Sequence, residues 1–158
     1  KTDLFNNNSE EETAKARKEA IFEALKNKDK DALKAIFSQK AISDAEDLDA
    51  KLDNLFIFIQ GELVSSEEIT GLGVDESNDH GHVTKKVRTY FYINTDEQKY
   101  YIYLEDFPVD TDHPENVGLY LLLIVKAEDE DKVWDGEQKI MYDDRTRIPH
   151  AGIYITFE

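Results

Sequence analysis

The hydrophobic periodicity of the chain changes after Gly61, and this change limits the fold more than any other feature of the sequence. Before Gly61, apolar residues such as Ala20, Ile21 and Leu25 recur at the spacing of a helix face. After Gly61, β-branched and aromatic residues alternate with polar ones, which is typical of strands. Helices and strands that are segregated along a chain predict an α+β domain. We therefore expect helices packed on an antiparallel sheet.

Three helices are expected before Gly61, within a single domain over 9–158 that follows a flexible lead-in of residues 1–8. The first helix is predicted at about 10–27, and the third ends at Gly61. Each helix starts at a residue or pair with capping chemistry: Ser9 and Glu12 for the first, Asp29 for the second, Ser43 and Glu46 for the third.

Five strands are expected in the second half of the chain, separated by polar turns. They are predicted near 67–76, 83–94, 99–107, 117–126 and 151–157. Gly71 and Gly73 lie inside the first of them and predict a bulge that bends it.

Charge and composition exclude several classes of protein. The chain has 158 residues with 19 Lys+Arg against 35 Asp+Glu, a formal net charge of −16. Such a surface repels nucleic acid and offers no basic patch for anionic lipid. There is no cysteine, so disulfides and cysteine zinc sites are excluded. The longest apolar run, Leu119 to Val125, is far shorter than the about 20 residues that span a bilayer.

The sequence predicts no metal and no cofactor. His80 and His82 are two residues apart and would point to one side of a strand, with Asp75 or Asp79 as a third ligand. A structural zinc site needs four ligands, and histidine is also common in polar turns. Phosphate-binding glycine loops and the motifs of serine hydrolases and zinc proteases are absent from the sequence.

The segments 83–94 and 99–107 allow faces to be assigned, because a hairpin loop of two or four residues pairs even positions with odd ones. Lys85, Thr89 and Asp106 then lie on the face that packs on the helices, where a pocket can form. In the two-residue register Lys85 lies directly opposite Asp106. A buried carboxylate there could act as a general base. The alternative is a salt bridge at the rim, of little energetic value.

The opposite face of the same strands is rich in tyrosine. It predicts a contact surface for a second copy of the chain, as a weak homodimer, or for an unknown partner. The alternative is that cross-strand aromatic pairs only stabilise the sheet. The residues are Tyr90, Tyr92, Tyr101, Tyr103 and Tyr120.

Three strings, IFEALKNKDKDALKAIFS, DLDAKLDNLFIFIQGE and the terminal GIYI, together with the order of helices and sheet, support a resemblance. The chain resembles the cone-shaped nuclear transport factor 2-like (cystatin-like) fold and, within it, a domain-of-unknown-function family of bacterial lipoproteins. The resemblance implies a curved sheet and an extracytoplasmic protein held at the membrane only through an N-terminal lipid anchor, whose cysteine is not in this sequence. It implies no reaction and no functional residues.

These observations predict an extracytoplasmic binding or interaction module without catalysis of its own, whose partner is a small molecule or a protein. The alternative function is a small-molecule isomerase, dehydratase or hydrolase that uses Asp106 inside the cone. An enzyme of this kind should have a deep cavity with perturbed titratable groups, whereas the interior of a binding module can be filled by apolar side chains.

Overall fold

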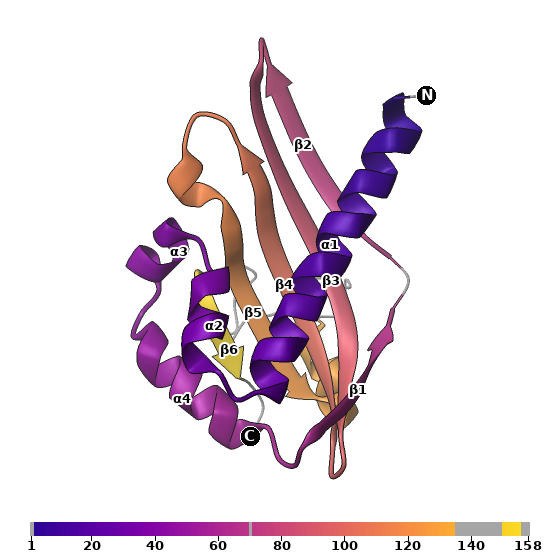
Figure 1. The fold of residues 1–158 in the computed structure, drawn as a ribbon, viewed down its shortest axis with the longest axis vertical. Coiled ribbons are helices and arrows are strands. Elements are labelled where there is room, and N and C mark those ends of the chain that lie inside the picture. The colour runs from indigo at the N-terminus through magenta and orange to yellow at the C-terminus, as the bar shows by residue number, and fades with distance from the viewer. Residues whose placement is uncertain (1, 70, 135–149, 156–158) are drawn as a thin grey trace.

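The computed structural model describes residues 2–69, 71–134 and 150–155, with side chains from Glu10 onward (Figure 1). It confirms an α+β fold in which helices precede a curved, open sheet. Four helices come first, because a short additional helix precedes the last of the three that the sequence predicts. They are α1 (Thr2–Lys26), α2 (Lys30–Ile36), α3 (Gln39–Asp44) and α4 (Leu48–Phe58).

Of the three helix starts predicted from the sequence, only one agrees with the structure. The Ala32 N–H donates to Asp29 Oδ1 over 3.0 Å, so Asp29 caps α2 as predicted. Helix α1 begins at Thr2, which places Ser9 inside the helix rather than at its start. The cap of α4 is Asp47, because Ser43 already belongs to the last turn of α3.

Within the described residues the sheet has six strands, one more than the sequence predicts. The first predicted strand, near 67–76, is divided into two that both pair with β3, along different parts of its length. Gly71, where we predicted a bulge, has a φ of +123° and lies in the link between them. The strands are β1 (Leu63–Glu68), β2 (Gly73–Asp79), β3 (His82–Thr95), β4 (Lys99–Asp110), β5 (Gly118–Lys126) and β6 (Gly152–Ile155).

The sheet is mixed, which corrects the expectation of a wholly antiparallel one. Strands β1 to β5 pair antiparallel, whereas β6 runs parallel to β5. Parallel neighbours need a crossover rather than a hairpin, and the chain between β5 and β6 includes the 3₁₀ helix η2 (Ala127–Val133). The remaining 3₁₀ helix, η1 (Pro114–Asn116), lies between β4 and β5. The final residues of the last predicted strand, 156–157, lie outside the described residues.

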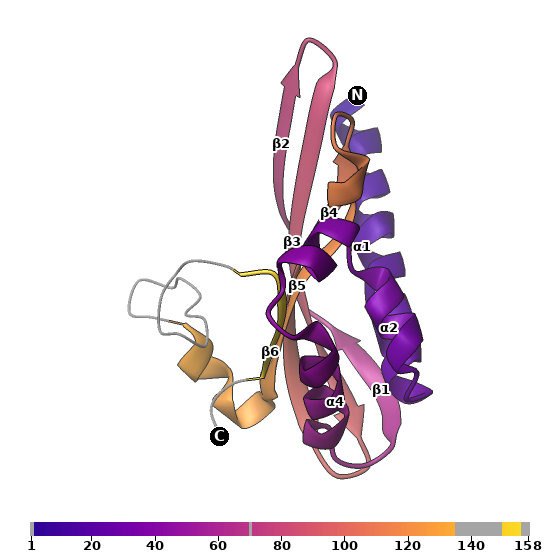
Figure 2. The same ribbon diagram turned by 90° about the vertical axis from the view of Figure 1, so that its left-hand side faces the viewer.

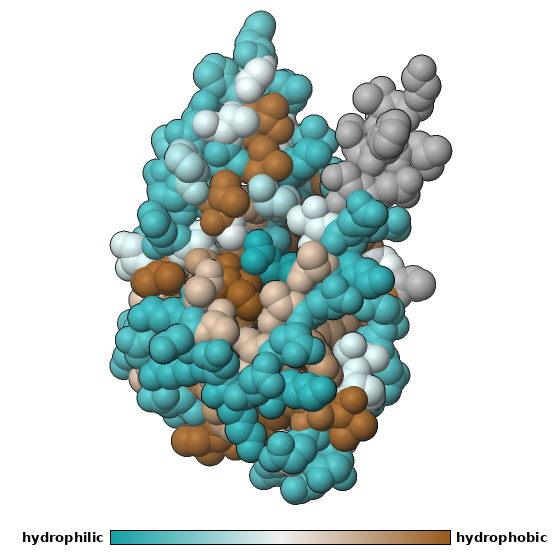
Figure 3. All heavy atoms as spheres, viewed as in Figure 1, coloured by the Kyte–Doolittle hydropathy of each residue, from teal (hydrophilic) through white to brown (hydrophobic). Residues whose placement is uncertain are grey.

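Apolar side chains fill both sides of the sheet, and α1 and η2 lie on opposite sides of it (Figure 2). The inner cluster joins helix residues such as Leu33, Leu52 and Leu55 to Phe91 and Ile102 of the sheet. The outer cluster is smaller and contains Tyr101, Tyr103, Leu121, Leu123, Val125, Val133 and Tyr154. Hydrophilic residues dominate the surface of the face that carries α1 (Figure 3).

Candidate functional site

Helix α1 is joined to the sheet by charged side chains. Glu10, Lys18 and Asp106 are buried, and a buried charge is tolerated when a partner of opposite sign is near. Three ion pairs provide these partners: Lys18 to Glu68 of β1 at 2.5 Å, Glu10 to Lys85 of β3 at 3.2 Å, and Arg17 to Asp106 of β4 at 3.1 Å.

Lys85 and Asp106 face α1, in agreement with the face assigned to them from the alternation. The prediction of an ion pair between Lys85 and Asp106 is wrong. Val87 lies opposite Asp106, and a further shift of register between Lys85 and Val87 places Lys85 opposite Val109. Four residues separate the closing pair of the hairpin, Asn94 and Lys99, which excludes the two-residue register.

Asp106 is only 1% exposed and has unequal contacts at its two carboxylate oxygens. Oδ2 accepts a hydrogen bond from Arg17 Nε, whereas Oδ1 is buried and has no hydrogen-bond partner in the described part of the chain. Burial raises the pKa of the Asp106 carboxyl, and Arg17 opposes part of this effect. A general-base role for Asp106 stays a prediction.

We expect Asp106→Asn to raise the free energy of unfolding at pH 7, by up to about 1 kcal/mol, because the neutral amide removes the cost of a buried charge. The amide oxygen can still accept from Arg17, whose side chain is 22% exposed and keeps contact with water. The pKa of Asp106 is higher in the folded chain than in the unfolded one, so the cost appears only as pH rises above the unfolded value of about 3.9. Urea unfolding between pH 3 and 8 measures this difference.

Asp110→Asn, on the same strand, is a control for which we expect the opposite change in the free energy of unfolding at pH 7. The Asn116 amide and the backbone N–H groups of His113 and Asp112 lower the pKa of Asp110, so its contribution is present above the ordinary pKa and is lost as pH falls. Asp110→Asn should therefore destabilise the chain at pH 7. If Asp106→Asn were also less stable than the native chain at pH 7, the Arg17 ion pair would outweigh the cost of burial.

A groove of about 770 Å³ lies between α1 and the β1–β2 edge of the sheet. Buried Thr89 of β3 lines it, as does Glu10, the partner of Lys85. Lys85 and Asp106 themselves are not among the lining residues. The walls combine charged and apolar side chains: Glu10, Glu11, Ala14, Lys15 and Lys18 of α1, with Glu68, Ile69, Gly71, Leu72 and Val74 of the opposite edge.

The groove depends on the way the chain passes from β1 to β2. At Gly71, a Cβ atom would lie 2.7 Å from the Tyr90 hydroxyl oxygen, and the φ of +123° is one that other residues rarely adopt. Sequence reasoning missed the α1 side of this site. Glu11 and Lys15, like Ala14 and Lys18, are four residues apart, and this spacing could have identified one lining face of the helix.

The predicted tyrosine surface is covered in part by the chain itself. Tyr101 and Tyr103 are buried in the outer cluster, whereas Tyr90, Tyr92 and Tyr120 are partly buried. The Tyr92 hydroxyl donates to Glu130 of η2, and this hydrogen bond is the largest of the effects that raise the pKa of Tyr92 to about 12. Contact of this tyrosine surface with a partner stays a prediction.

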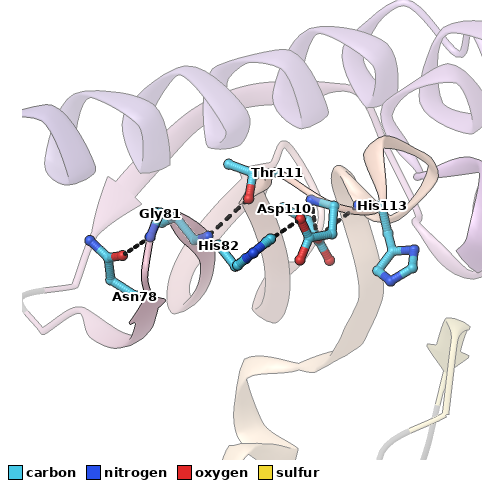
Figure 4. Close-up of polar contacts among 8 residues, drawn as sticks. Asn78, Gly81, His82, Asp110, Thr111 and His113 are labelled. Atoms are coloured by element: carbon cyan, nitrogen blue, oxygen red, sulfur yellow. Dashed lines mark hydrogen bonds and ion pairs between the residues drawn. The ribbon is translucent and has the colours of Figure 1, made fainter.

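The two histidines singled out as metal ligands contact different carboxylates at the end of the β2–β3 hairpin. His80 Nδ1 lies 2.6 Å from Asp79 Oδ1, and His82 Nδ1 lies 2.7 Å from Asp112 Oδ1. Figure 4 shows His82 directed toward the end of β4 at Asp110. Among the described residues, no three His, Asp or Glu side chains are grouped so that they could hold a metal ion. The expected absence of a metal stays a prediction.

Comparison with known proteins identifies a family but no activity. In the part of the chain that the structure describes, no helix is long and apolar enough to cross a membrane. None of the curated proteins compared with the chain matches its sequence. Residues 20–127, about two thirds of the chain, match the model of a family described as a domain of unknown function (DUF5104). The matched segment extends from the second half of α1 through β5 to the first residue of η2, and the chain therefore belongs to the DUF5104 family.

Proposed function

We propose that the protein is a non-catalytic binding module that holds a small zwitterionic ligand, such as a free amino acid or a dipeptide, in the groove beside α1. The observation that carries this proposal is the groove itself, whose volume of about 770 Å³ lies within the range of about 300–1,000 Å³ common for ligand sites. Elsewhere between the helices and the sheet, buried side chains such as Leu33, Leu52 and Phe91 fill the interior.

The groove combines the groups that a zwitterion needs. Glu11 and Lys15 are exposed on α1, four residues apart, and bring opposite charges to one wall. Leu72 and Val74 are partly buried on the facing wall and offer apolar surface to the body of a ligand. The ammonium group of the ligand would pair with the carboxylate of Glu11, and the carboxylate of the ligand would pair with the ammonium group of Lys15.

The alternative function, catalysis by Asp106, has one observation in its favour. Burial raises the pKa of the Asp106 carboxyl, as is common in catalytic acids and bases. Against it, Arg17 engages one carboxylate oxygen and Asp106 does not line the groove, so a ligand bound there would not meet it. We therefore prefer binding to catalysis.

We further propose that the fold is of the nuclear transport factor 2-like class and that the protein is a lipid-anchored, extracytoplasmic lipoprotein. A long helix packed across a curved sheet supports the fold class (Figure 1). The anchor and the location rest on the resemblance of the helical strings alone. Labelling of the full-length gene product with a radioactive fatty acid, in the cells that make it, tests the anchor.

Titration with leucine and with a glycine–leucine dipeptide, followed by backbone amide NMR, tests the binding proposal. We expect the signals of Val74 and Thr89 to shift. Lys15→Glu should weaken binding at least fivefold, because it replaces the ammonium at the rim with a carboxylate. Lys26→Glu is the matched control: it makes the same charge change at an exposed position of α1 outside the groove, and it should change the affinity less than twofold.

Two further probes distinguish recognition of both charges from apolar binding. Leucine amide lacks the carboxylate and acetyl-leucine lacks the ammonium, so each should bind at least fivefold more weakly than leucine. Equal binding of all probes would contradict the zwitterion proposal. Absence of any shift at the groove, or equal effects of Lys15→Glu and Lys26→Glu, would contradict the assignment of the site.

A further inference from the structure

The buried side of helix α1 changes in character along the helix. From Glu10 onward, its buried side chains divide into two groups. The first group is mostly charged, whereas the second is apolar and belongs to the inner cluster. The groups are Glu10, Ala14 and Lys18 in the first half of the helix and Ile21, Ala24 and Leu25 in the second. The two halves of α1 therefore dock on the sheet through different interactions.

Ion pairs hold the first half of α1 to the sheet, and they are made by Glu10, Arg17 and Lys18. Such pairs contribute little net stability, because removing the charges from water costs about as much free energy as their attraction returns. Glu10 and Lys18 regain water when this half leaves the sheet. The second half docks through the burial of apolar side chains such as Ile21 and Leu25, which is favourable. The first half is therefore the more weakly docked of the two.

The weakly docked half is also one wall of the groove of about 770 Å³. The described residues of α1 that line the groove extend from Glu10 to Lys18, whereas the apolar residues of the second half lie in the inner cluster. Separation of the first half from the sheet would therefore open the groove on this side and leave the core of the domain intact.

We propose that residues 10–19 of α1 detach from the sheet by local unfolding and act as a gate of the groove, while residues 24–26 stay docked. A detached helical segment of this length is marginal in water, so it loses its helical hydrogen bonds. Such an opening requires much less free energy than global unfolding. The detachment itself does not depend on any ligand, whereas its role as a gate rests on the function proposed for the groove.

Native-state amide hydrogen exchange of the whole chain, without ligand, tests the detachment. Two segments of α1 are compared, Ala14–Lys18 and Ala24–Lys26, and both lie inside the helix, so that their amides have helical partners in the docked state. We expect the protection factors of Ala14–Lys18 to be at least tenfold lower than those of Ala24–Lys26. Equal protection factors in the two segments would overturn the proposal.

Glu68→Gln distinguishes detachment from simple fraying of the helix end, because the substitution is on the sheet and leaves the helix sequence unchanged. The Lys18 side chain is only 9% exposed, and in this variant its ammonium group faces a neutral amide while α1 is docked. Detachment returns Lys18 to water, so the variant should favour it. We expect exchange at Ala14–Lys18 to become at least fivefold faster, with less than a twofold change at Ala24–Lys26.

Glu67→Gln is the matched control on the same strand. Glu67 contacts Asn94 and Lys99 rather than α1, so the same charge change there should alter exchange in α1 less than twofold. Circular dichroism checks that each variant folds. Faster exchange at Ala14–Lys18 that Glu68→Gln leaves unchanged would show fraying of the helix end and overturn the proposal. Equal effects of the two variants would indicate a general charge effect and overturn it as well.

Leucine tests the role of the detached segment as a gate. A ligand that binds only the docked state, at ten times its Kd, should slow exchange at Ala14–Lys18 about tenfold. If leucine shifts the signals of Val74 and Thr89 but does not slow this exchange, the groove binds the ligand and the gate is overturned. If leucine shifts no signal at the groove, the function proposed for the groove fails and the gate fails with it, whereas the exchange without ligand still measures the detachment.

Discussion

Gly118→Ala is expected to lower the free energy of unfolding by about 2–6 kcal/mol, the sum of backbone strain and overpacking. Gly118 has a φ of +133°, which an alanine rarely adopts. A Cβ atom there would lie 2.8 Å from the backbone nitrogen of Ser38 and 2.9 Å from its Cα. The Ser38 N–H donates to the Leu119 carbonyl over 2.9 Å, so the chain between α2 and α3 cannot move away without losing this bond. Urea unfolding followed by circular dichroism measures the effect.

Gly81→Ala separates the two causes. Gly81 has a φ of +90° in the β2–β3 turn, but apart from its two chain neighbours no residue has a heavy atom within 4 Å of the position of its Cβ. Only the backbone strain applies, and we expect a loss of about 1–2 kcal/mol. Equal losses for the two variants would show that the contact with Ser38 contributes nothing.

Leu55→Ala is expected to lower the free energy of unfolding by about 2–5 kcal/mol, because it leaves a cavity in a well-packed core. Leu55 is 0% exposed and belongs to the inner cluster that joins α4 to the sheet. Thermal and urea unfolding measure the loss, and far-ultraviolet circular dichroism checks that the native helix content is kept.

Ile57→Ala is the matched control on the same helix. Ile57 is 77% exposed, so shortening its side chain leaves no cavity, and we expect a change within about 0.5 kcal/mol. If Ile57→Ala destabilised the chain as much as Leu55→Ala, the packing of α4 against the sheet would differ from that described here.

The sequence alone was sufficient for the α+β class and for the faces of the central hairpin. Alternation has a period of two residues, so it separates Phe91 and Ile93, which pack under the helices, from Tyr90 and Tyr92 on the other side. The cap at Asp29 was also predictable, because it depends on a hydrogen bond to a residue only three positions further along the chain. These features are local, and local chemistry determines them.

Contacts between distant segments were decided only by the tertiary structure. The four-residue loop of the β3–β4 hairpin separates Lys85 from Asp106, and the docking of α1 then pairs Asp106 with Arg17, 89 residues away in the chain. Periodicity assigns a residue to a face but cannot say which segment will cover that face. For this reason the burial of Tyr101, the parallel pairing of β6 and the groove beside α1 could not be predicted from the sequence.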